Sequence, residues 1–421
     1  MKKILVIMVC FLPLFSAAQE GFDWNLKAGA YNRVENDQSY IVASFKPYFQ
    51  IDKFFGALDL EFAFDPDGTL KRDDWDNTKK ITEKITLIGY GDPEQDPFFF
   101  RFGMLDDISL GFGILVNRFR NDIYYPQIKK TGFFGGFDVG ATGLSFFVED
   151  SYDLDFFGGR LFVRPLNPLE DPSIPAFIKN LEFGISFVMD KDPYNQDTSA
   201  TGYYLADDSS QSVAVKAFAL DMAFPLIEGK NFSLDNYVQY GDLVDAGAGI
   251  GYGFRGRFFT FMGYKTELSY NWDGFIPGYF SSFYGVRDVR KNRFDEASAS
   301  EDGFGYLLGF YVEALKKQLL SGLEYTDSPA EGPQLLFYVY MKPEVIKRLY
   351  LKFNYSRKDI DGIVDAFDIK SLKGNTMILL ELGYEITTNA AISIRYIENF
   401  QEVDGVVSGK SMTEIQTTLL F

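Results

Sequence analysis

The sequence predicts an all-β fold in which a closed antiparallel sheet crosses a membrane as a barrel. Three observations support this prediction. Apolar and polar residues alternate with a period of two along much of the chain, which is typical of strands. No run after the N-terminal segment has the ~20 apolar residues that a membrane-spanning helix needs. The 421 residues include 44 Phe, 26 Tyr and 3 Trp, and aromatic side chains at alternate strand positions are typical of membrane barrels.

The alternation is clear between residues 181 and 190. Leu181, Phe183, Ile185, Phe187 and Met189 share one face, and the other face carries small, polar and charged residues. A soluble β-sandwich also alternates, but its large residues meet inside and its polar face meets bulk water. In this chain each segment of about ten residues has bulky side chains on one face and glycine or charged residues on the other. This pattern favours a barrel whose bulky faces form a lipid-facing belt and whose other faces line a hydrated lumen.

We expect sixteen to twenty strands, with twenty as the best estimate. The segments with this alternation are 22–31, 39–50, 54–65, 80–90, 98–105, 128–140, 143–150, 156–165, 180–190, 211–224, 231–241, 246–257, 259–270, 303–314, 317–326, 334–342, 348–357, 376–386, 391–400 and 411–421.

The predicted links alternate between short turns and longer polar stretches. The long stretches are 66–79, 106–127, 191–210, 271–302, 358–375 and 401–410. Short turns on one side and long loops on the other are the arrangement of bacterial outer-membrane barrels. An even number of strands then places both termini on the short-turn side, the predicted periplasmic side.

The N-terminal segment 1–18 has the three-part layout of a secretory signal peptide. Lys2 and Lys3 precede the apolar run 4–12, and Ser16-Ala17-Ala18 provides small residues for cleavage after Ala18. A lipoprotein signal at Cys10 is the alternative, but Val9 stands where a small residue is needed. We therefore expect export and one mature domain, a barrel over 19–421.

Composition excludes several kinds of chemistry. The chain has no histidine, and its single cysteine lies in the signal segment, so the mature chain lacks disulfides, imidazole metal sites and His-assisted catalysis. We expect no enzyme activity, no cofactor and no metal.

The net charge of −18 becomes −20 when Lys2 and Lys3 are removed, and such an acidic chain repels nucleic acid. Solvated loops account for the acidity most simply, and the alternatives are loops that bind divalent cations at a lipopolysaccharide surface or a cation-preferring lumen.

The C-terminal segment carries a family resemblance. Residues 411–421 alternate and end on Phe421, with Leu419, Thr417 and Ile415 on the same face. This ending resembles the C-terminal signal by which outer-membrane barrels are recognised for assembly. With the signal peptide, the chain resembles porin-like outer-membrane proteins of Gram-negative bacteria. The resemblance implies a place in the cell outer membrane, and as partners its lipid and lipopolysaccharide-type surface, the barrel assembly machinery and small solutes. It leaves association into a homo-oligomer open.

The segment 98–126 is too apolar for a free external loop, yet glycines and charges interrupt it. One hypothesis is that 106–122 folds into the lumen as a constriction, with Asp106 and Asp107 facing Arg118 and Arg120. The alternative is one more membrane hairpin over 98–118. Alternation also predicts charges that line the lumen: Asp59, Glu61, Arg160, Arg164, Arg255, Lys265, Glu267, Glu313 and Arg395. Aromatic pairs at strand ends, such as Phe156-Phe157, are interpreted as interfacial girdles.

These features favour a porin-like channel for passive diffusion of small hydrophilic solutes. A transporter of hydrophobic compounds is the second hypothesis, motivated by the aromatic stretch 274–284 and the apolar stretch 98–116. A structural or adhesive surface barrel is the third.

Overall fold

The computed structural model describes residues 22–420 with internal gaps. The gaps are 36–37, 123–124, 126–128, 170, 172, 194–213, 283, 285–301, 316–317, 359, 361–362, 367–375, 388–389 and 404–405. The predicted signal peptide and Phe421 lie outside the described residues. Among those residues, helices are few and short: η2 (Arg72–Trp75), α2 (Thr78–Thr82), α3 (Ala176–Lys179) and α5 (Ile363–Ala366). None of them has the length and apolar character to cross a membrane.

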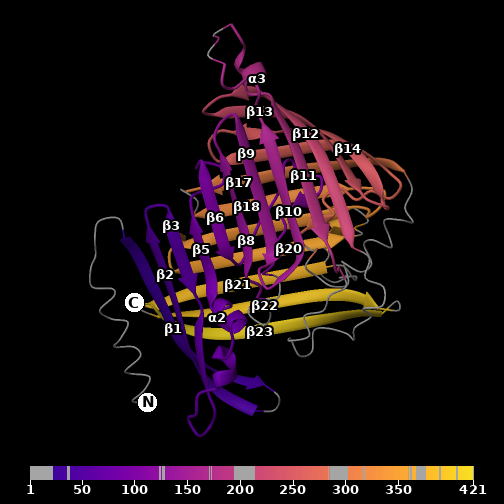
Figure 1. Cartoon of the computed structure of the whole chain (residues 1–421). Coiled ribbons are helices and arrows are strands. Elements are labelled where there is room, and N and C mark those ends of the chain that lie inside the picture. The colour runs from indigo at the N-terminus through magenta and orange to yellow at the C-terminus, as the bar shows by residue number, and fades with distance from the viewer. Residues whose placement is uncertain are drawn as a thin grey trace.

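One antiparallel sheet forms almost the whole described chain (Figure 1). Its first half comprises β1 (Phe22–Glu35), β2 (Gln38–Ile51), β3 (Phe54–Leu58), β4 (Leu60–Phe64), β5 (Ile85–Tyr90), β6 (Phe98–Gly103), β8 (Gly132–Asp138), β9 (Thr142–Asp150), β10 (Asp153–Val163), β11 (Glu182–Asp190) and β12 (Val215–Glu228). Its second half comprises β13 (Phe232–Leu243), β14 (Gly247–Phe258), β15 (Met262–Trp272), β17 (Gly303–Ala314), β18 (Leu319–Asp327), β19 (Gln334–Ile346), β20 (Leu349–Lys358), β21 (Thr376–Thr387), β22 (Ala390–Val403) and β23 (Val406–Leu420).

The two ends of this sheet pair with each other. From β5 onward each strand of the sheet pairs with the next, β3 pairs with β2 and β5, and β1 pairs with both β2 and β23, with Lys27 opposite Leu420. In Figure 1 the yellow C-terminal strands return to the indigo β1. β3 and β4 both pair with β2 and are two pieces of one strand interrupted at Asp59, so the 21 described strands occupy twenty positions. The predicted all-β antiparallel fold is confirmed, and the pairing of β1 with β23 joins the two ends of the sheet.

Three sequence predictions about the links are wrong. The strand expected from 80 begins at Ile85, because α2 precedes it and the Asn77 side chain caps that helix by accepting from the Lys80 backbone N–H at 2.9 Å. The long link expected over 401–410 is short, since β22 reaches Val403 and lies opposite Val406 of β23. The link 164–181 is long although it lies on the short-turn side, because four prolines between 165 and 175 cannot continue strand pairing.

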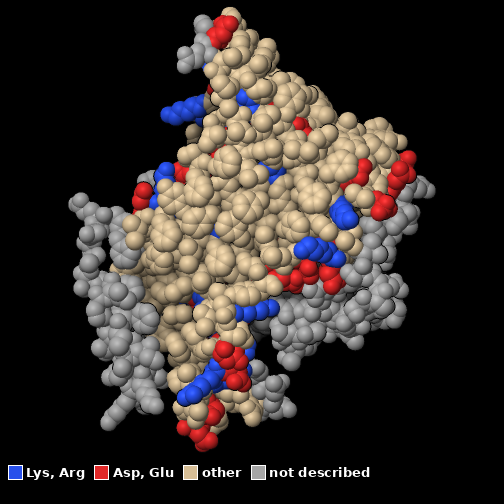
Figure 2. Space-filling view, viewed as in Figure 1, with Lys and Arg blue, Asp and Glu red and all other residues tan. Residues whose placement is uncertain are grey.

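The outer face of the sheet is apolar. On β11, the side chains of Phe183, Ile185 and Phe187 are 41%, 52% and 47% exposed, whereas Ser186 and Val188, on the other face of the strand, are almost fully buried. The same outward exposure recurs around the sheet, at Phe218, Leu220, Ile250, Tyr252, Leu268, Phe304, Leu308, Phe310, Leu323, Leu382 and Ile394. Figure 2 shows such a surface, on which charged side chains are sparse over the middle and gather toward the ends. This belt matches the lipid-facing band of a membrane barrel.

Candidate functional site inside the barrel

Two long links from opposite parts of the chain meet inside the sheet. The link 104–131 contains β7 (Val116–Asn117), and the link 273–302 contains β16 (Phe280–Ser281); these two short strands pair in parallel. We call the described residues 104–122, 273–282 and Tyr284 the inner unit. The alternative prediction of a hairpin over 98–118 does not fit, because β6 ends at Gly103 and pairs with β8.

An apolar core holds the inner unit together and attaches it to one sector of the wall. Leu105, Phe119, Phe275 and Phe280 are each 0% exposed. The core continues into inward-facing side chains of the wall, including Phe99, Phe134, Phe147, Phe156, Val188, Val215, Ala217, Ala219 and Leu243. The Phe119 ring lies 4.9 Å from that of Phe156 and 5.5 Å from that of Phe147. Phe156 is thus a core residue, and its interpretation as part of an interfacial girdle is wrong.

The opposite side of the inner unit is polar and faces another sector of the wall. Asn117 donates to Glu324 of β18 at 3.0 Å, and Lys265 of β15 donates to the backbone carbonyl of Phe112 at 2.7 Å. The Phe112 ring stacks on Tyr237 of β13 with ring centroids 4.2 Å apart. Contacts to strands this far apart along the sheet place the inner unit within the ring of strands.

Arg118 lies at the centre of the polar side. Its guanidinium donates to Asp107 at 3.0 Å and to the Tyr338 hydroxyl at 3.3 Å, and it stacks 4.4 Å from the centre of the Tyr338 ring. The backbone of Arg118 is in the left-handed region, with φ +56°, and its N–H donates to the Ser109 hydroxyl. This turn conformation directs the side chain away from the apolar core that β7 enters.

The other three predicted constriction residues pair differently from the prediction. Asp106 lies 3.7 Å from Arg101 of β6, and Arg120 makes a bidentate pair with Asp122 at 2.6 and 2.8 Å. Burial alone would raise the pKa of Asp122, but the adjoining Arg120 guanidinium lowers it to about 2. The prediction placed Asp106 and Asp107 opposite Arg118 and Arg120. The structure shows a direct contact for one such pair, Asp107 with Arg118.

All four predicted constriction residues nevertheless border one space. A cavity of about 230 Å³ lies between the inner unit and the wall formed by β18 to β21. Its lining includes Arg101, Asp106, Asp107, Arg118, Arg120, Tyr338, Tyr340 and Asn354. The side chains of Asp106 and Asp107 are 67% and 56% exposed, so both carboxylates are open to this space.

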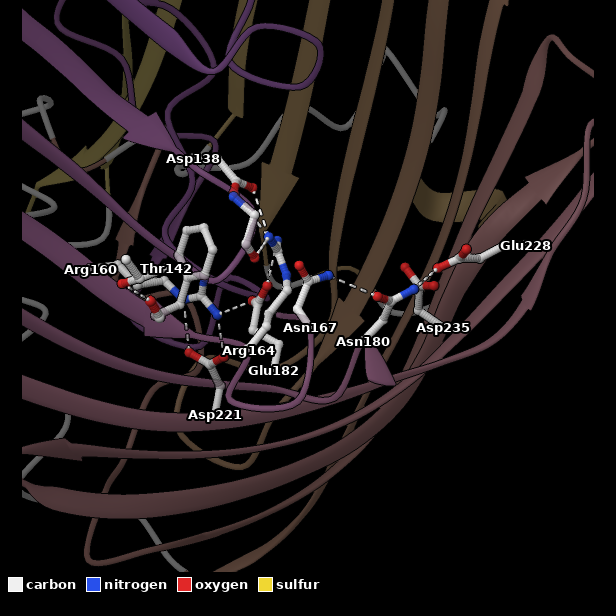
Figure 3. A network of polar contacts seen from close by, with 12 residues as sticks. Asp138, Thr142, Arg160, Arg164, Asn167, Asn180, Glu182, Asp221, Glu228 and Asp235 are labelled. Atoms are coloured by element: carbon white, nitrogen blue, oxygen red, sulfur yellow. Dashed lines mark hydrogen bonds and ion pairs between the residues drawn. The ribbon is translucent and has the colours of Figure 1, made fainter. Parts of the chain in front are cut away.

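The predicted lumen-lining residues of β10 belong to a network on the inner face of the wall (Figure 3). Arg160 donates to Asp221 at 3.0 Å and to Glu182 at 2.6 Å. Arg164, just beyond the strand, contacts Asp138 at 2.9 Å and Glu182 at 2.7 Å. These ion pairs connect β8, β10, β11 and β12, so both arginines have a structural role in the wall.

The remaining predicted lining residues are spread around the interior. Asp59 contacts Lys129 at 2.7 Å and Glu61 lies 3.7 Å from Arg33, whereas Arg255 stacks 4.4 Å from the Phe112 ring. Glu267 accepts from Tyr237 at 2.8 Å and from Gln239 at 2.6 Å. Three others complete the set: Lys265 contacts the inner unit, Arg395 stacks 5.3 Å from Tyr125, and Glu313 is exposed near the short-turn end of β17.

Sequence reasoning missed Arg101, Asp122, Glu324 and Tyr338. The sequence contains a signal for Arg101, which is the single charged residue in the aromatic strand β6. It lies two residues after the inward-facing Phe99, so it is on the same, inward face of the strand. Asp122 follows Arg120 by two residues, but nothing in the sequence marks them as a pair. In the part of the chain that the structure describes, no group of three or more carboxylates is arranged to hold a metal ion.

No protein-family model matches the sequence, and no curated protein matches it. Similar solved structures include Pseudomonas aeruginosa OccK11 (OpdR), with 8% identity, 95% of this chain and 94% of that chain covered, and a TM-score of 0.36. The ferric enterobactin receptor PfeA has 11% identity, 96% and 74% coverage and a TM-score of 0.35. Wzi of Escherichia coli, a carbohydrate-binding β-barrel of the outer membrane, has 10% identity, 99% and 88% coverage and a TM-score of 0.29. Scores below 0.5 carry no inference about this chain. Its own strand pairing and apolar belt give it the architecture of a membrane-spanning β-barrel.

Proposed function

We propose that this protein is an outer-membrane channel for passive diffusion of small hydrophilic solutes. The observation that carries the proposal is the charged cavity of about 230 Å³ inside a ring of strands whose outer face is apolar. An apolar exterior suits lipid, and a charged interior suits water and solutes. The short-turn side then faces the periplasm, and the belt contacts outer-membrane lipid.

The two sectors of the wall explain where solutes pass. Between β6 and β13 a set of inward apolar side chains is covered by the core of the inner unit, with Phe147 0% and Phe156 1% exposed, and the ion pairs of Arg160 lie in the same sector. Between β15 and β21 the inward side chains include the polar residues Glu267, Glu324 and Asn354. The passage therefore runs between the polar side of the inner unit and this second sector.

The charges of the inner unit narrow and polarise this passage. The Asp106 and Asp107 carboxylates come from the first turn of the link 104–131, and Arg118 and Arg120 come from the segment after β7. All four charges lie on the inner-unit side of the passage, and charges of opposite sign beside a narrow passage produce a local field that discriminates solutes by charge and dipole. Asp106, Asp107, Arg118 and Arg120 are the residues we assign to the constriction.

The structure gives a hydrophobic-compound transporter less support. The aromatic stretch that motivated it contributes Phe275, Ile276 and Phe280, which are each 0% exposed in the core of the inner unit. Side chains packed in this way are not presented to a ligand. The apolar stretch 98–116 has the same role through Leu105, Ile108 and Val116.

Planar-bilayer recording of the purified mature protein tests the proposal. We expect stepwise conductance, and we expect Asp107→Asn and Arg118→Gln to shift the reversal potential in opposite directions under a salt gradient. The matched control is Glu94→Gln, which removes an exposed carboxylate in a short turn outside the passage. Folded protein without conductance, or constriction variants with the selectivity of the control, would overturn the proposal.

A further inference from the structure

A second cavity adjoins the constriction at Arg118. It has room of about 80 Å³ and is lined by Lys265, Glu267, Glu324 and Glu331, together with Gln239 and Arg118 itself. Arg118, Ser282, Leu336 and Ser356 border both cavities. The two spaces therefore meet at the Arg118 side chain.

The two cavities lie one after the other along the barrel. The second cavity reaches Asp327, Ser328 and Glu331, at the long-loop ends of β18 and β19 and in the link between them. The constriction cavity reaches Leu320 and Tyr340, which lie nearer the short-turn ends of the same strands. A solute that enters from the long-loop side meets the second cavity first and then passes Arg118.

The second cavity contains acceptors for a cationic group. The carboxylates of Glu267 and Glu324 both face it and are 7% and 6% exposed. Gln239 donates its amide N–H to Glu267, while its side-chain Oε1 has no hydrogen-bond partner among the described residues, although Gln239 is 1% exposed. A buried acceptor without a partner costs free energy, and an ammonium group of a solute would satisfy it.

The same cavity contains donors for an anionic group. Arg118 is held by Asp107 on the constriction side, and its guanidinium has five N–H donors, so a carboxylate in the second cavity can share it. Lys265 lines the cavity as well and uses one of its three N–H donors on the Phe112 carbonyl. Both signs of charge therefore lie within reach of one small solute.

We propose that the second cavity binds small dipolar solutes that carry an ammonium and a carboxylate group, as amino acids do, before they pass Arg118. The ammonium contacts Glu267, Glu324 and Gln239, and the carboxylate contacts Arg118. A neutral polyol of similar size offers no charged group to either set of side chains, and a solute with a single charge interacts with one side of the cavity. This inference rests on the proposed channel function and names its substrate class.

Swelling of liposomes that contain the mature protein tests this assignment. Serine and erythritol are of similar size, and the ratio of their swelling rates is the readout. We expect a ratio above one that falls about tenfold in Arg118→Gln and in Glu324→Gln, because each removes one charge-assisted contact. Arg118→Lys should restore part of the ratio, whereas Glu94→Gln should leave it unchanged.

The outcomes separate the two proposals. If neither solute enters liposomes that contain folded protein, the channel function itself fails. If erythritol enters and the ratio is near one, or is the same in Arg118→Gln as in the Glu94→Gln control, the dipolar selectivity is wrong. Where a charge variant does not fold, Gln239→Leu keeps every charge, and we expect it to lower the ratio as well; an unchanged ratio would again overturn the inference.

Discussion

The buried ion pair between Arg120 and Asp122 gives the sharpest test of the inner unit. We predict that Asp122→Asn destabilises the protein by about 3 kcal/mol at pH 7, the lower end of the range for removing one partner of a buried pair. Both side chains are 8% exposed and make two hydrogen bonds to each other. Asparagine keeps one acceptor but leaves the guanidinium without its counter-charge. Removal of the carboxylate also leaves Lys352, 3.9 Å away, without this partner.

The same pair predicts a pH dependence. The pKa of Asp122 in the folded protein is lowered to about 2 by Arg120, although burial acts in the opposite direction. A folded-state pKa below the unfolded value means that the stabilisation is complete above about pH 4 and is lost as the pH falls toward 2. The pKa difference corresponds to about 2 to 3 kcal/mol, at 1.36 kcal/mol per pKa unit.

Equilibrium urea unfolding in detergent micelles, repeated between pH 7 and pH 2, measures both effects. The matched control is the double variant Arg120→Met with Asp122→Leu, which removes both charges and should cost less than the single change. A single variant within 0.5 kcal/mol of the wild-type protein would refute the reasoning, and so would a double variant less stable than the single one. Asp122→Asn should also lose the part of the acid sensitivity that the wild-type protein owes to this group.

Three further predictions concern the packing of the inner unit, the lipid-facing side of the wall and the space beside a wall glycine. Phe119→Ala should cost about 3–5 kcal/mol in urea unfolding, because Phe119 is 0% exposed in the core of the inner unit; an effect below 1 kcal/mol would contradict that packing. Leu220→Arg, on the outer face, should cost about 2–4 kcal/mol in refolding from urea into lipid vesicles, whereas Leu220→Phe should be nearly neutral; equal stability of the two would contradict a lipid-facing position. Gly184→Ala should destabilise the wall by about 1–3 kcal/mol, because its Cβ would lie 2.5 Å from Arg160 and Asp221, and the less crowded Gly263→Ala serves as its control in the same unfolding assay.

The order of strands could be predicted from the sequence because lipid imposes one simple rule. Side chains that face lipid are favoured when they are apolar, so alternation persists through β11, β14, β15 and β17 whatever their partners are. Prediction failed where local chemistry replaced alternation. Asn77 begins a helix just before β5, and β22 continues to Val403, opposite Val406 of β23, where the sequence Asp404-Gly405 favours a two-residue hairpin.

The charges of the constriction could be predicted from the sequence, but their partners could not. Paired aspartates and arginines within an apolar stretch indicated a loop in the lumen. The partners Tyr338 and Glu324 lie more than 200 residues along the chain from Arg118 and Asn117, and no local pattern connects them. These residues come close together because the links 104–131 and 273–302 pack against the inner face of the sheet. That packing is tertiary structure and has no local signal in the sequence.

One further signal in the sequence bears on the position of the passage. In β6, β9 and β10, consecutive residues are aromatic on both faces: Phe98 is 52% exposed and Phe99 6%, and Phe146 is 42% exposed and Phe147 0%. An inward phenylalanine in contact with water would forfeit roughly 1.5–3 kcal/mol of burial, so a strand that is apolar on both faces implies a covering segment inside the barrel. Strands with glycine or charged residues on the inner face, such as β14 and β15, do not require a covering segment inside the barrel. The side of the lumen that the inner unit fills, and hence the side left for solutes, is therefore determined by which strands are apolar on both faces.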